Sequence, residues 1–286
     1  MTIGFIGLGI MGMKMALNLQ KNGFDVIGFN RTKSKEEEFV RLGGRRAASL
    51  AELGCMADAI IACLPNDVIV REMIVNLLTA TELKFKLFID CSTIDVAAAG
   101  VIGEMMQKRG VYYFDSPVSG GPAGAEEGTL TIMAGGDEKA FYDLAQPIFK
   151  AIGSNIMYFG ENGSGQKAKL INQILTWVNH AVICEAAVLA KKAGLDMDKL
   201  YDCIMTSYGY SRVFEMTYRS HIQQENYENP TGMQMLVKDL KLAQAFAASY
   251  SARLPMTDES MKLYLNALEA GFGGKDPGII MEQLKT

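Results

Sequence analysis

Short apolar runs alternate with amphipathic stretches along the first half of the chain. Runs of strand length occupy 3–6, 25–29, 59–63, 87–90 and 112–115. Stretches with helical spacing of apolar residues occupy 11–22, 34–42, 68–78 and 96–108. Strands that alternate with helices in this way are typical of a doubly wound α/β fold with a mostly parallel sheet. Asp67 is the expected N-cap of the third helix.

The alternation continues as far as a glycine-rich loop, Gly160–Gly165. Two further strands are predicted at 129–134 and 156–159, with a helix at 138–151 between them. Pro147 should bend or break this helix, because proline lacks the backbone N–H that a helix interior uses.

Beyond the glycine-rich loop only helical patterns remain. They occupy 166–192, 198–205, 211–223, 233–249 and 257–270. Asp276 and Pro277 suit the N-cap and the first position of a last helix. We therefore predict a doubly wound α/β domain at 1–162 and an all-helical domain at 163–286, joined by the long helix.

The long helix at 166–192 is mostly apolar and must be covered on most of its faces. Burial between domains or between subunits would cover it. No uninterrupted apolar run reaches the length that a bilayer requires, so no membrane partner is expected.

The composition is that of a globular protein and excludes several classes of function. The 286 residues carry a formal net charge of −4, which gives no electrostatic case for a nucleic-acid partner. Five cysteines without a C-x-x-C pair argue against a metal site and favour a reduced, cytoplasmic location. The N-terminus lacks the basic region of a signal peptide. With His180 and His221 as the only two histidines, a general acid is expected to be another residue type.

The first apolar run leads into a G-x-G-x-x-G sequence and then a helix, which is the context of a dinucleotide fingerprint. Gly7 permits the tight turn, Gly9 lets a pyrophosphate approach the backbone, and Gly12 lets the helix pack on the strand. Ile10 and Met11 begin the helix whose N-terminus would face the phosphates. An ordinary glycine turn is the alternative.

The second strand ends at Asn30, Arg31 and Thr32. An NAD-binding fold usually carries Asp or Glu at this point to accept from the ribose 2′-OH. Asn30 lacks that carboxylate, and Arg31 offers a bidentate donor to a 2′-phosphate. The segment therefore favours NADP, as NADPH, over NAD, and a solvated polar loop is the alternative.

Later strand ends carry further candidates, because ligands bind outside the carboxyl ends of such strands. Leu64 and Pro65 follow the third apolar run, and Thr93 follows the fourth. After the fifth, the small residues Ser119, Gly120 and Gly121 let backbone N–H groups converge on an anion. A merely flexible loop is equally compatible with that last segment.

Lys169 lies near the start of the long helix, with Asn172 and Gln173 three and four positions on, hence on the same face. The three make a polar cluster able to hold a carbonyl oxygen. A lysine at the helix surface is the alternative, and Lys167 fits that as well. Lys238 with Asp239 is a second candidate pair, for which the alternative is an exposed charged face.

Together these residues resemble the β-hydroxyacid dehydrogenase family over nearly the full length. The matching stretches are GFIGLGIMG (4–12), DSPVSGG (115–121), GTL (128–130), GSGQKAKLINQ (163–173) and KDL (238–240). The resemblance implies a Rossmann domain that binds the dinucleotide and a helical domain for substrate and oligomerisation. It also implies a homodimer or homotetramer.

The resemblance also assigns roles. Lys169, followed by Asn172 and Gln173, matches the family's catalytic lysine, which Lys167 does not. Ser119, Gly120 and Gly121 would take the substrate carboxylate. The cofactor positions would include Leu64, Pro65, Thr93 and Lys238.

The chain departs from many relatives at Gln173, where an Asn is common, and at Thr231, where an aromatic residue often borders the substrate pocket. Asn30, Arg31 and Thr32 resemble the NADPH-dependent branch. Arg212 is a candidate for a second substrate carboxylate, with a surface charge as the alternative.

The sequence thus predicts an NADPH-dependent reductase of a small acid semialdehyde or 2-oxo acid, of glyoxylate, succinic semialdehyde or tartronate semialdehyde type. Lys169 would be the general acid. An NAD(P)-dependent dehydrogenase of hydroxyisobutyrate type is the alternative with the same chemistry. A non-catalytic nucleotide-binding assembly module is the alternative from another class.

Overall fold

The computed structural model describes residues 1–80, 82–224, 226–228 and 232–285. The chain divides into two compact units, Met1–Lys169 and Leu170–Thr286. The division falls inside the long helix α9 (Ser164–Lys192), whose first residues pack with the sheet of the first unit. The domain boundary expected from the sequence, between 162 and 163, lies in the loop just before this helix.

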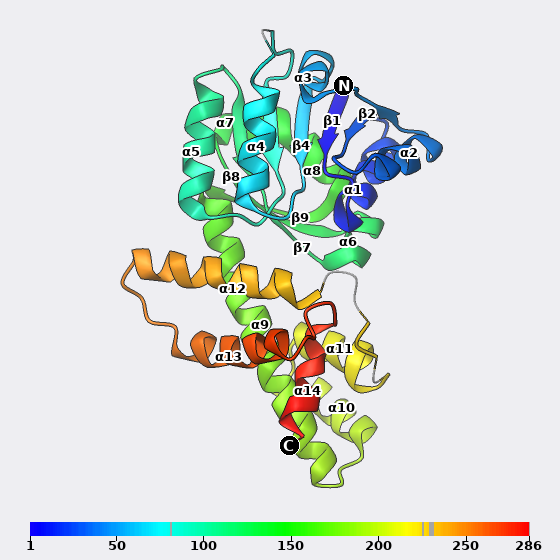
Figure 1. The fold of residues 1–286 in the computed structure, drawn as a ribbon, viewed down its shortest axis with the longest axis vertical. Coiled ribbons are helices and arrows are strands. Elements are labelled where there is room, and N and C mark those ends of the chain that lie inside the picture. The colour runs from blue at the N-terminus through cyan, green and yellow to red at the C-terminus, as the bar shows by residue number, and fades with distance from the viewer. Residues whose placement is uncertain (81, 225, 229–231, 286) are drawn as a thin grey trace. The chain divides into compact units, whose positions relative to one another are not determined.

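The first unit is built on one sheet of nine strands, in the order β3-β2-β1-β4-β5-β6-β8-β7, with β9 beside β8 (Figure 1). The strands are β1 (Thr2–Ile6), β2 (Asp25–Phe29), β3 (Arg45–Arg46), β4 (Ala59–Ala62), β5 (Leu87–Asp90), β6 (Tyr112–Asp115), β7 (Val118–Ser119), β8 (Leu130–Gly135) and β9 (Gly153–Gly160). All pairs from β3 to β6 are parallel, and β8 is antiparallel to β6 and β7. The predicted mostly parallel sheet is confirmed.

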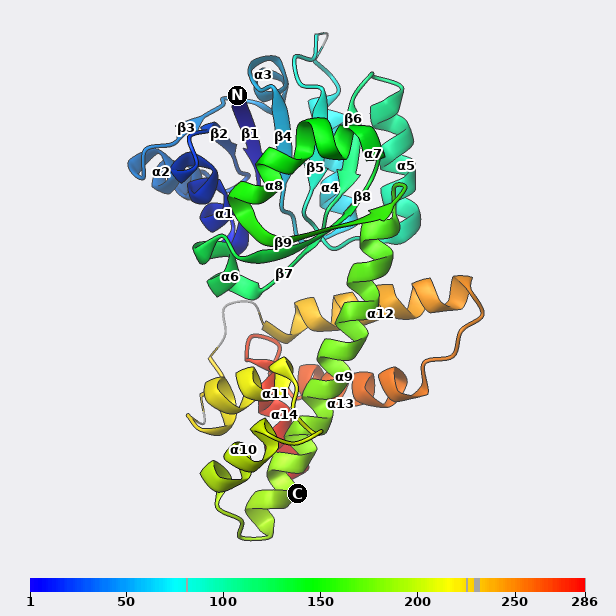
Figure 2. The same ribbon diagram turned by 180° about the vertical axis from the view of Figure 1, so that it is seen from behind.

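Helices cover both faces of this sheet, so the doubly wound fold is confirmed. The helices α3 (Leu50–Met56), α4 (Asp67–Leu77) and α5 (Val96–Gln107) lie on one face. Figure 2 shows the other face, which carries α1 (Ile10–Lys21), α6 (Gly121–Glu127), α7 (Glu138–Ala140) and α8 (Gln146–Ile152). The helix α2 (Lys33–Arg41) sends Phe39 into the core of this second face.

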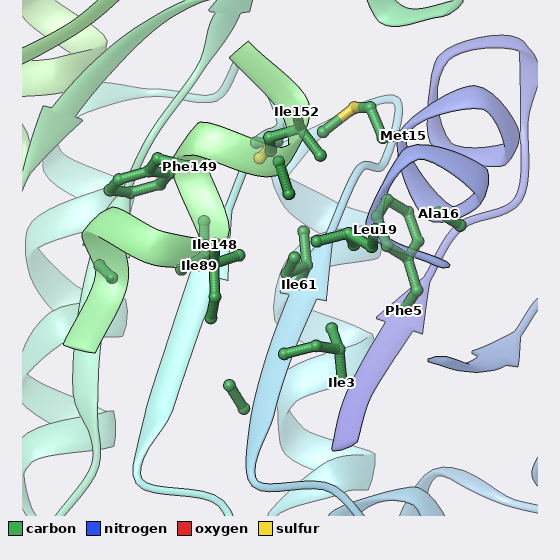
Figure 3. Packing of buried hydrophobic residues seen from close by; sticks show 14 of the residues in the cluster. Ile3, Phe5, Met15, Ala16, Leu19, Ile61, Ile89, Ile148, Phe149 and Ile152 are labelled. Carbon is green, nitrogen blue, oxygen red and sulfur yellow. The ribbon is translucent and has the colours of Figure 1, made fainter. Parts of the chain in front are cut away.

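Successive side chains along each strand point to opposite faces of the sheet, so each strand contributes to two separate cores. In β1, Ile3 and Phe5 join the core beneath α1 and α8, and Ile6 joins the core beneath α3 to α5. Figure 3 shows the first of these cores, where Phe149 and Ile152 of α8 approach the strand residues. Because both faces are covered, the central strands are buried throughout and read as continuous apolar runs.

Several local features differ from the sequence-based expectation. The N-cap of α4 is Asn66 and not Asp67: the Asn66 side chain accepts a hydrogen bond from the Ile69 amide at 2.9 Å. The short elements β3, α3, β7 and α6 had no apolar periodicity long enough to reveal them. Pro147 does interrupt its helix, which changes to a π turn at Phe141–Ala145 before α8 begins.

The second unit is helical, as predicted. Beyond its part of α9 it contains α10 (Met197–Met205), α11 (Arg212–Thr217), a π turn (Tyr218–Ile222), α12 (Gly232–Ser249), α13 (Pro255–Glu269), a 3-10 turn (Pro277–Ile279) and α14 (Ile280–Leu284). Asp276 caps the 3-10 turn by accepting from the Gly278 amide at 2.8 Å, as its position before Pro277 predicted. Leu236, Leu240 and Tyr264 lie at the centre of the apolar core.

By length and mean hydropathy, α9 is the one helix among the described residues that is able to cross a membrane. This differs from the expectation from the sequence, in which no apolar run was long enough. A core helix passes the same test, so the property by itself is weak grounds for a membrane-spanning segment.

His180 of α9 is buried in the core of the second unit. Its Nδ1 lies 3.0 Å from the Tyr264 hydroxyl, which donates to the Trp177 carbonyl at 2.8 Å. Burial lowers the pKa of His180 to about 4; the Asp276 charge opposes this shift and His221 adds to it. The imidazole is therefore neutral in the folded protein at neutral pH.

The shifted pKa predicts an acid-sensitive contribution to stability. An unfolded histidine titrates near pH 6.5, so between about pH 4 and 6.5 the unfolded state binds more protons and stability rises with pH. We expect the free energy of unfolding of the protein, relative to His180→Gln, to rise through this window by on the order of 3 kcal/mol. Denaturant titrations at several pH values measure it.

Tyr264→Phe is the control, because it removes the hydroxyl partner but keeps the titrating ring, and its pH slope should persist. A difference between the protein and His180→Gln that is the same at pH 4.5 and pH 7 contradicts the account.

Candidate active site

The turn between β1 and α1 is a glycine turn with no room for side chains at two of its positions. Gly7 has φ +98°, and a Cβ there would lie 2.3 Å from the Cys63 carbonyl oxygen. A Cβ at Gly12 would lie 1.9 Å from the Gly7 carbonyl oxygen. The two glycines therefore let α1 pack directly on the end of β1.

Gly9 differs, because a Cβ placed there meets no atom within 4 Å. It is the N-cap of α1 and supplies no side-chain hydrogen bond to the helix. Ile10, the next residue, is 40% exposed. An open backbone at the positive end of a twelve-residue helix suits a pyrophosphate, so these residues fit a dinucleotide.

At the end of β2, the Asn30 side chain ties this strand to the glycine turn. Its Oδ1 accepts from the Leu8 amide at 2.9 Å, and its Nδ2 donates to the Thr32 carbonyl at 3.0 Å. Arg31 and Thr32 are exposed beside it. The alternative of a merely solvated loop does not fit Asn30, which has a defined structural role.

Glu36, which was not predicted from the sequence, places its carboxylate at this strand end. It is 1% exposed, accepts from the Asn30 amide at 2.8 Å and pairs with Lys33 at 3.0 Å. A carboxylate therefore lies beside the end of β2, although Asn30 occupies the position where one is usual. Glu36 is six positions after Asn30, and the turn into α2 brings the two together.

The ends of β4 and β5 are joined by a hydrogen bond. The Leu64 amide donates to the Ser92 hydroxyl at 2.9 Å. Pro65 is exposed and Thr93 is partly exposed. The structure thus brings the Leu64–Pro65 turn and Thr93 to the same carboxyl edge of the sheet, as predicted.

Lys169 reaches the strand that carries Ser119. Its Nζ donates to the Val118 carbonyl at 2.9 Å, and the residue is 7% exposed. The alternative of a lysine on the helix surface is therefore wrong for Lys169. Gly120 (φ +133°) and Gly121 (φ +62°) follow Ser119 in conformations that favour glycine.

Asp115, at the end of β6, holds the start of α9 and was quoted in the sequence only as part of a motif. Its Oδ1 accepts from the Gly163 amide at 2.7 Å and its Oδ2 from the Gln166 amide at 2.8 Å. Burial raises the pKa of the Asp115 carboxyl to about 7, although both amides lower it. The side chain replaces a local N-cap for the helix that carries Lys169.

In the second unit, Gln173 is bonded to the pair that the sequence singled out. Its Nε2 donates to Asp239 Oδ2 at 2.6 Å, and its Oε1 accepts from Asn172 at 3.3 Å. Lys238 pairs with Asp239 Oδ1 at 3.0 Å. Asp239 is 4% exposed, so the alternative of an exposed charged face is wrong for it.

For two further candidate residues, Arg212 and Thr231, the structure adds no support for a role at the substrate. Arg212 is the first residue of α11 and is exposed, as the surface-charge alternative has it. Thr231 lies outside the described residues. Among the residues that the structure describes, no group of three or more His, Cys, Asp or Glu side chains is placed to hold a metal.

Comparison with known proteins matches both parts of the chain to nicotinamide enzymes. Residues 2–160 match the family described as the NAD binding domain of 6-phosphogluconate dehydrogenase. Residues 163–283 match the NAD-binding domain of NADP-dependent 3-hydroxyisobutyrate dehydrogenase.

Full-length relatives lead to the same group of enzymes. The 2-(hydroxymethyl)glutarate dehydrogenase of Eubacterium barkeri is 32% identical over 98% of this chain and 93% of its own. The 2-hydroxy-3-oxopropionate reductase of Escherichia coli K12 is 32% identical over 100% and 97%. A solved structure of Mycobacterium tuberculosis 3-hydroxyisobutyrate dehydrogenase with L-serine superposes with a TM-score of 0.90, at 30% identity and 100% and 99% coverage.

Two substitutions in the glycine turn should have different effects, one on the stability of the protein and the other on cofactor binding. Gly12→Ala places a methyl group against the Gly7 carbonyl and should destabilise the protein by about 1–3 kcal/mol or more. Gly9→Ala adds a methyl group in open space, so the stability should stay within about 0.5 kcal/mol while the affinity for NADPH falls at least tenfold. Thermal unfolding and fluorescence titration of NADPH measure the two effects. If Gly9→Ala binds NADPH as tightly as the unchanged protein, no phosphate lies over this turn.

Proposed function

The chain belongs to the β-hydroxyacid dehydrogenase family, and from this premise we propose that it is an NADPH-dependent reductase of a small acid semialdehyde or 2-oxo acid. Oxidation and reduction at the CH–OH group of a hydroxy acid with a nicotinamide cofactor is the chemistry that its relatives share. Glyoxylate, succinic semialdehyde and 2-hydroxy-3-oxopropionate (tartronate semialdehyde) are the substrate types that we propose. The observation that carries the proposal is the buried lysine held beside β7.

Lys169 acts as the general acid in this proposal. When bound, the reduced nicotinamide supplies a hydride to the carbonyl carbon. The Lys169 ammonium gives its proton to the carbonyl oxygen, so the carbonyl gains H⁻ and H⁺ and becomes the alcohol. The hydrogen bond to the Val118 carbonyl orients Nζ at the strand that precedes Ser119.

The remaining residues bind and orient. Ser119 and the amides at Gly120 and Gly121 would hold the substrate carboxylate, since the hydroxyl and the convergent backbone suit an anion. Asn172 and Gln173 would position Lys169 and the substrate. Lys238, paired with Asp239, would contact the cofactor, and Arg212 is a proposed partner for a second carboxylate.

The preference for NADPH rests on Arg31. It is exposed at the end of β2, next to Asn30, whose side chain is fixed by the Leu8 amide. An arginine there meets a 2′-phosphate with charge-assisted bonds. Glu36 does not oppose this preference strongly, because its carboxylate is buried and already paired with Lys33.

The Glu36 carboxylate favours a second candidate function, an NAD(P)-dependent dehydrogenase of hydroxyisobutyrate type. If Lys33 and the Asn30 amide released Glu36, it could accept from the ribose diol of NADH. The relative cofactor efficiencies separate the two candidates.

We also propose a homodimer or homotetramer in the cytoplasm. Four large apolar residues of α9 are exposed at helical spacing, namely Ile171, Leu175, Val182 and Leu189. A second copy of the chain would cover such a stripe. The five cysteines are all free thiols, which suits a reducing compartment.

The role of Lys169 is tested by a matched pair of lysine variants. Lys169→Ala should lower kcat by about two to four orders of magnitude, the usual worth of a general acid, with the NADPH dissociation constant within threefold. Lys167→Ala, on a helix side about 200° away, should keep kcat within threefold. Single-turnover kinetics and NADPH titration measure the effects. Turnover within tenfold after Lys169→Ala removes it as the acid, and an equal loss in Lys167→Ala means that the wrong lysine was assigned.

The role of Arg31 is tested by the cofactor preference of an alanine variant. Arg31→Ala should raise the KM for NADPH about tenfold, which corresponds to about 1.4 kcal/mol, and should change the KM for NADH less than twofold. Arg41→Ala, which removes an arginine from the last turn of α2, is the control and should change neither. Initial rates with both cofactors at a fixed aldehyde concentration give the comparison. Equal efficiency of the unchanged protein with the two cofactors would favour the second candidate.

A further inference from the structure

Gln166, in the first turn of α9, holds the loop that follows β5. Its Nε2 donates to the Ser92 carbonyl at 2.8 Å, and its Oε1 accepts from the Ile94 amide at 3.1 Å. Gln166 is 0% exposed and Ser92 is 2% exposed. The two bonds bracket Thr93, so the amide group of one side chain fixes the backbone on both sides of this residue.

Ser92 is in turn bonded to the end of β5 and to the turn that follows β4. Its amide donates to Asp90 Oδ1 at 2.9 Å, and its hydroxyl accepts from the Leu64 amide at 2.9 Å. The loop after β4, the loop after β5 and the start of α9 thus form one connected set of hydrogen bonds. All of these groups belong to the first unit.

The backbone of Gln166 is fixed independently of its side chain. Its amide donates to Asp115 Oδ2 at 2.8 Å. At the preceding residue, Gly165, a Cβ would lie 2.2 Å from the Met133 carbonyl oxygen and 2.4 Å from that of Asp115. The first turn of α9 therefore lies directly against β6 and β8, and the Gln166 side chain extends from a rigid base.

Lys169 lies three residues after Gln166, almost one turn further along the same helix. Its Nζ is bonded to the Val118 carbonyl of β7. One helical turn therefore reaches the loop of Thr93 through Gln166 and the strand of Ser119 through Lys169. The side-chain bonds of Gln166 thus connect this helical turn to the loop of Thr93.

We propose that Gln166 is a positioning residue, which locks the Ser92–Ile94 loop to the turn of α9 that carries Lys169. This rests on the proposed function, in which Thr93 contacts the nicotinamide cofactor and Lys169 is the acid. A misplacement of about 1 Å between reacting groups is enough to cost about a hundredfold in rate. Gln166 thus acts on hydride transfer through geometry and contacts neither reactant.

The test compares two variants of similar shape that each lose two bonds from an amide side chain to backbone carbonyl or amide groups. Gln166→Met removes the bonds to the Ser92 carbonyl and the Ile94 amide. Asn162→Leu, the control, removes bonds from Nδ2 to the Tyr113 carbonyl at 2.8 Å and the Gly135 carbonyl at 3.3 Å. Both sites lie in the first unit, and the two bonds of Asn162 go to Tyr113 and Gly135, not to residues 92–94.

Amide hydrogen exchange without any cofactor is the first readout. We expect the Ile94 amide to exchange at least tenfold faster in Gln166→Met and at an unchanged rate in Asn162→Leu. The second readout is kinetic. Gln166→Met should lower kcat at least tenfold, with the NADPH dissociation constant and the aldehyde KM within threefold. The isotope effect from [4-²H]NADPH should increase as hydride transfer becomes rate-limiting, and Asn162→Leu should keep kcat within threefold.

Equal losses of kcat in the two variants, in proportion to their losses of melting temperature, would overturn the proposal, because Gln166 would then be merely structural. An unchanged Ile94 exchange rate in Gln166→Met would overturn it as well. If Gln166→Met does not fold, Gln166→Asn keeps an amide group, but its side chain is one methylene shorter and cannot reach both the Ser92 carbonyl and the Ile94 amide. The same fall in kcat is expected of it, and an unchanged kcat overturns the proposal. Lys169→Ala, measured in parallel, shows separately whether the proposed acid itself fails.

Discussion

The buried carboxylate of Asp115 is the interaction on which the candidate site depends. It accepts from two amides at the start of α9, the Gly163 and Gln166 N–H groups, where a helix otherwise leaves donors unsatisfied. The positive end of the helix favours a negative charge at this place. Burial nevertheless raises the pKa of this carboxyl to about 7, so the arrangement costs free energy that a purely structural cap on the surface would not.

The parallel sheet brings the other candidate residues to the place where Asp115 holds α9. Its strands from β1 to β6 end at the same edge, which brings together the glycine turn, Asn30, Leu64 and Thr93 from separate parts of the sequence. The turn of α9 with Gln166 and Lys169 is fixed to that edge by Asp115. The chemistry that its relatives share, oxidation and reduction at a CH–OH group, needs a cofactor and an acid at one place, and in the proposed function this edge holds both.

Residue patterns were enough to predict the parallel sheet, the helical second unit and the glycine turn, because long apolar periodicity and glycine spacing report directly on backbone structure. The sequence alone did not predict contacts that form only when a turn or the tertiary fold brings residues together, nor elements too short to show periodicity. Glu36 reaches the end of β2 only through the turn into α2, and the short elements β7 and α6 have no periodicity. Helical spacing alone left open whether Lys169 lies on the surface or in the interior. Its bond to the Val118 carbonyl, 51 residues away in the sequence, places it in the interior.

We propose that the site transfers a hydride to the carbonyl of a substrate that is held by its carboxylate. The most direct measurement follows deuterium from [4-²H]NADPH into product in a single turnover, with succinic semialdehyde and with butanal, which has the same chain length without the carboxylate. We expect deuterium to appear at the carbinol carbon of the hydroxy acid and butanal to react at least tenfold more slowly. Equal rates with the two aldehydes, or a product without deuterium, would contradict it.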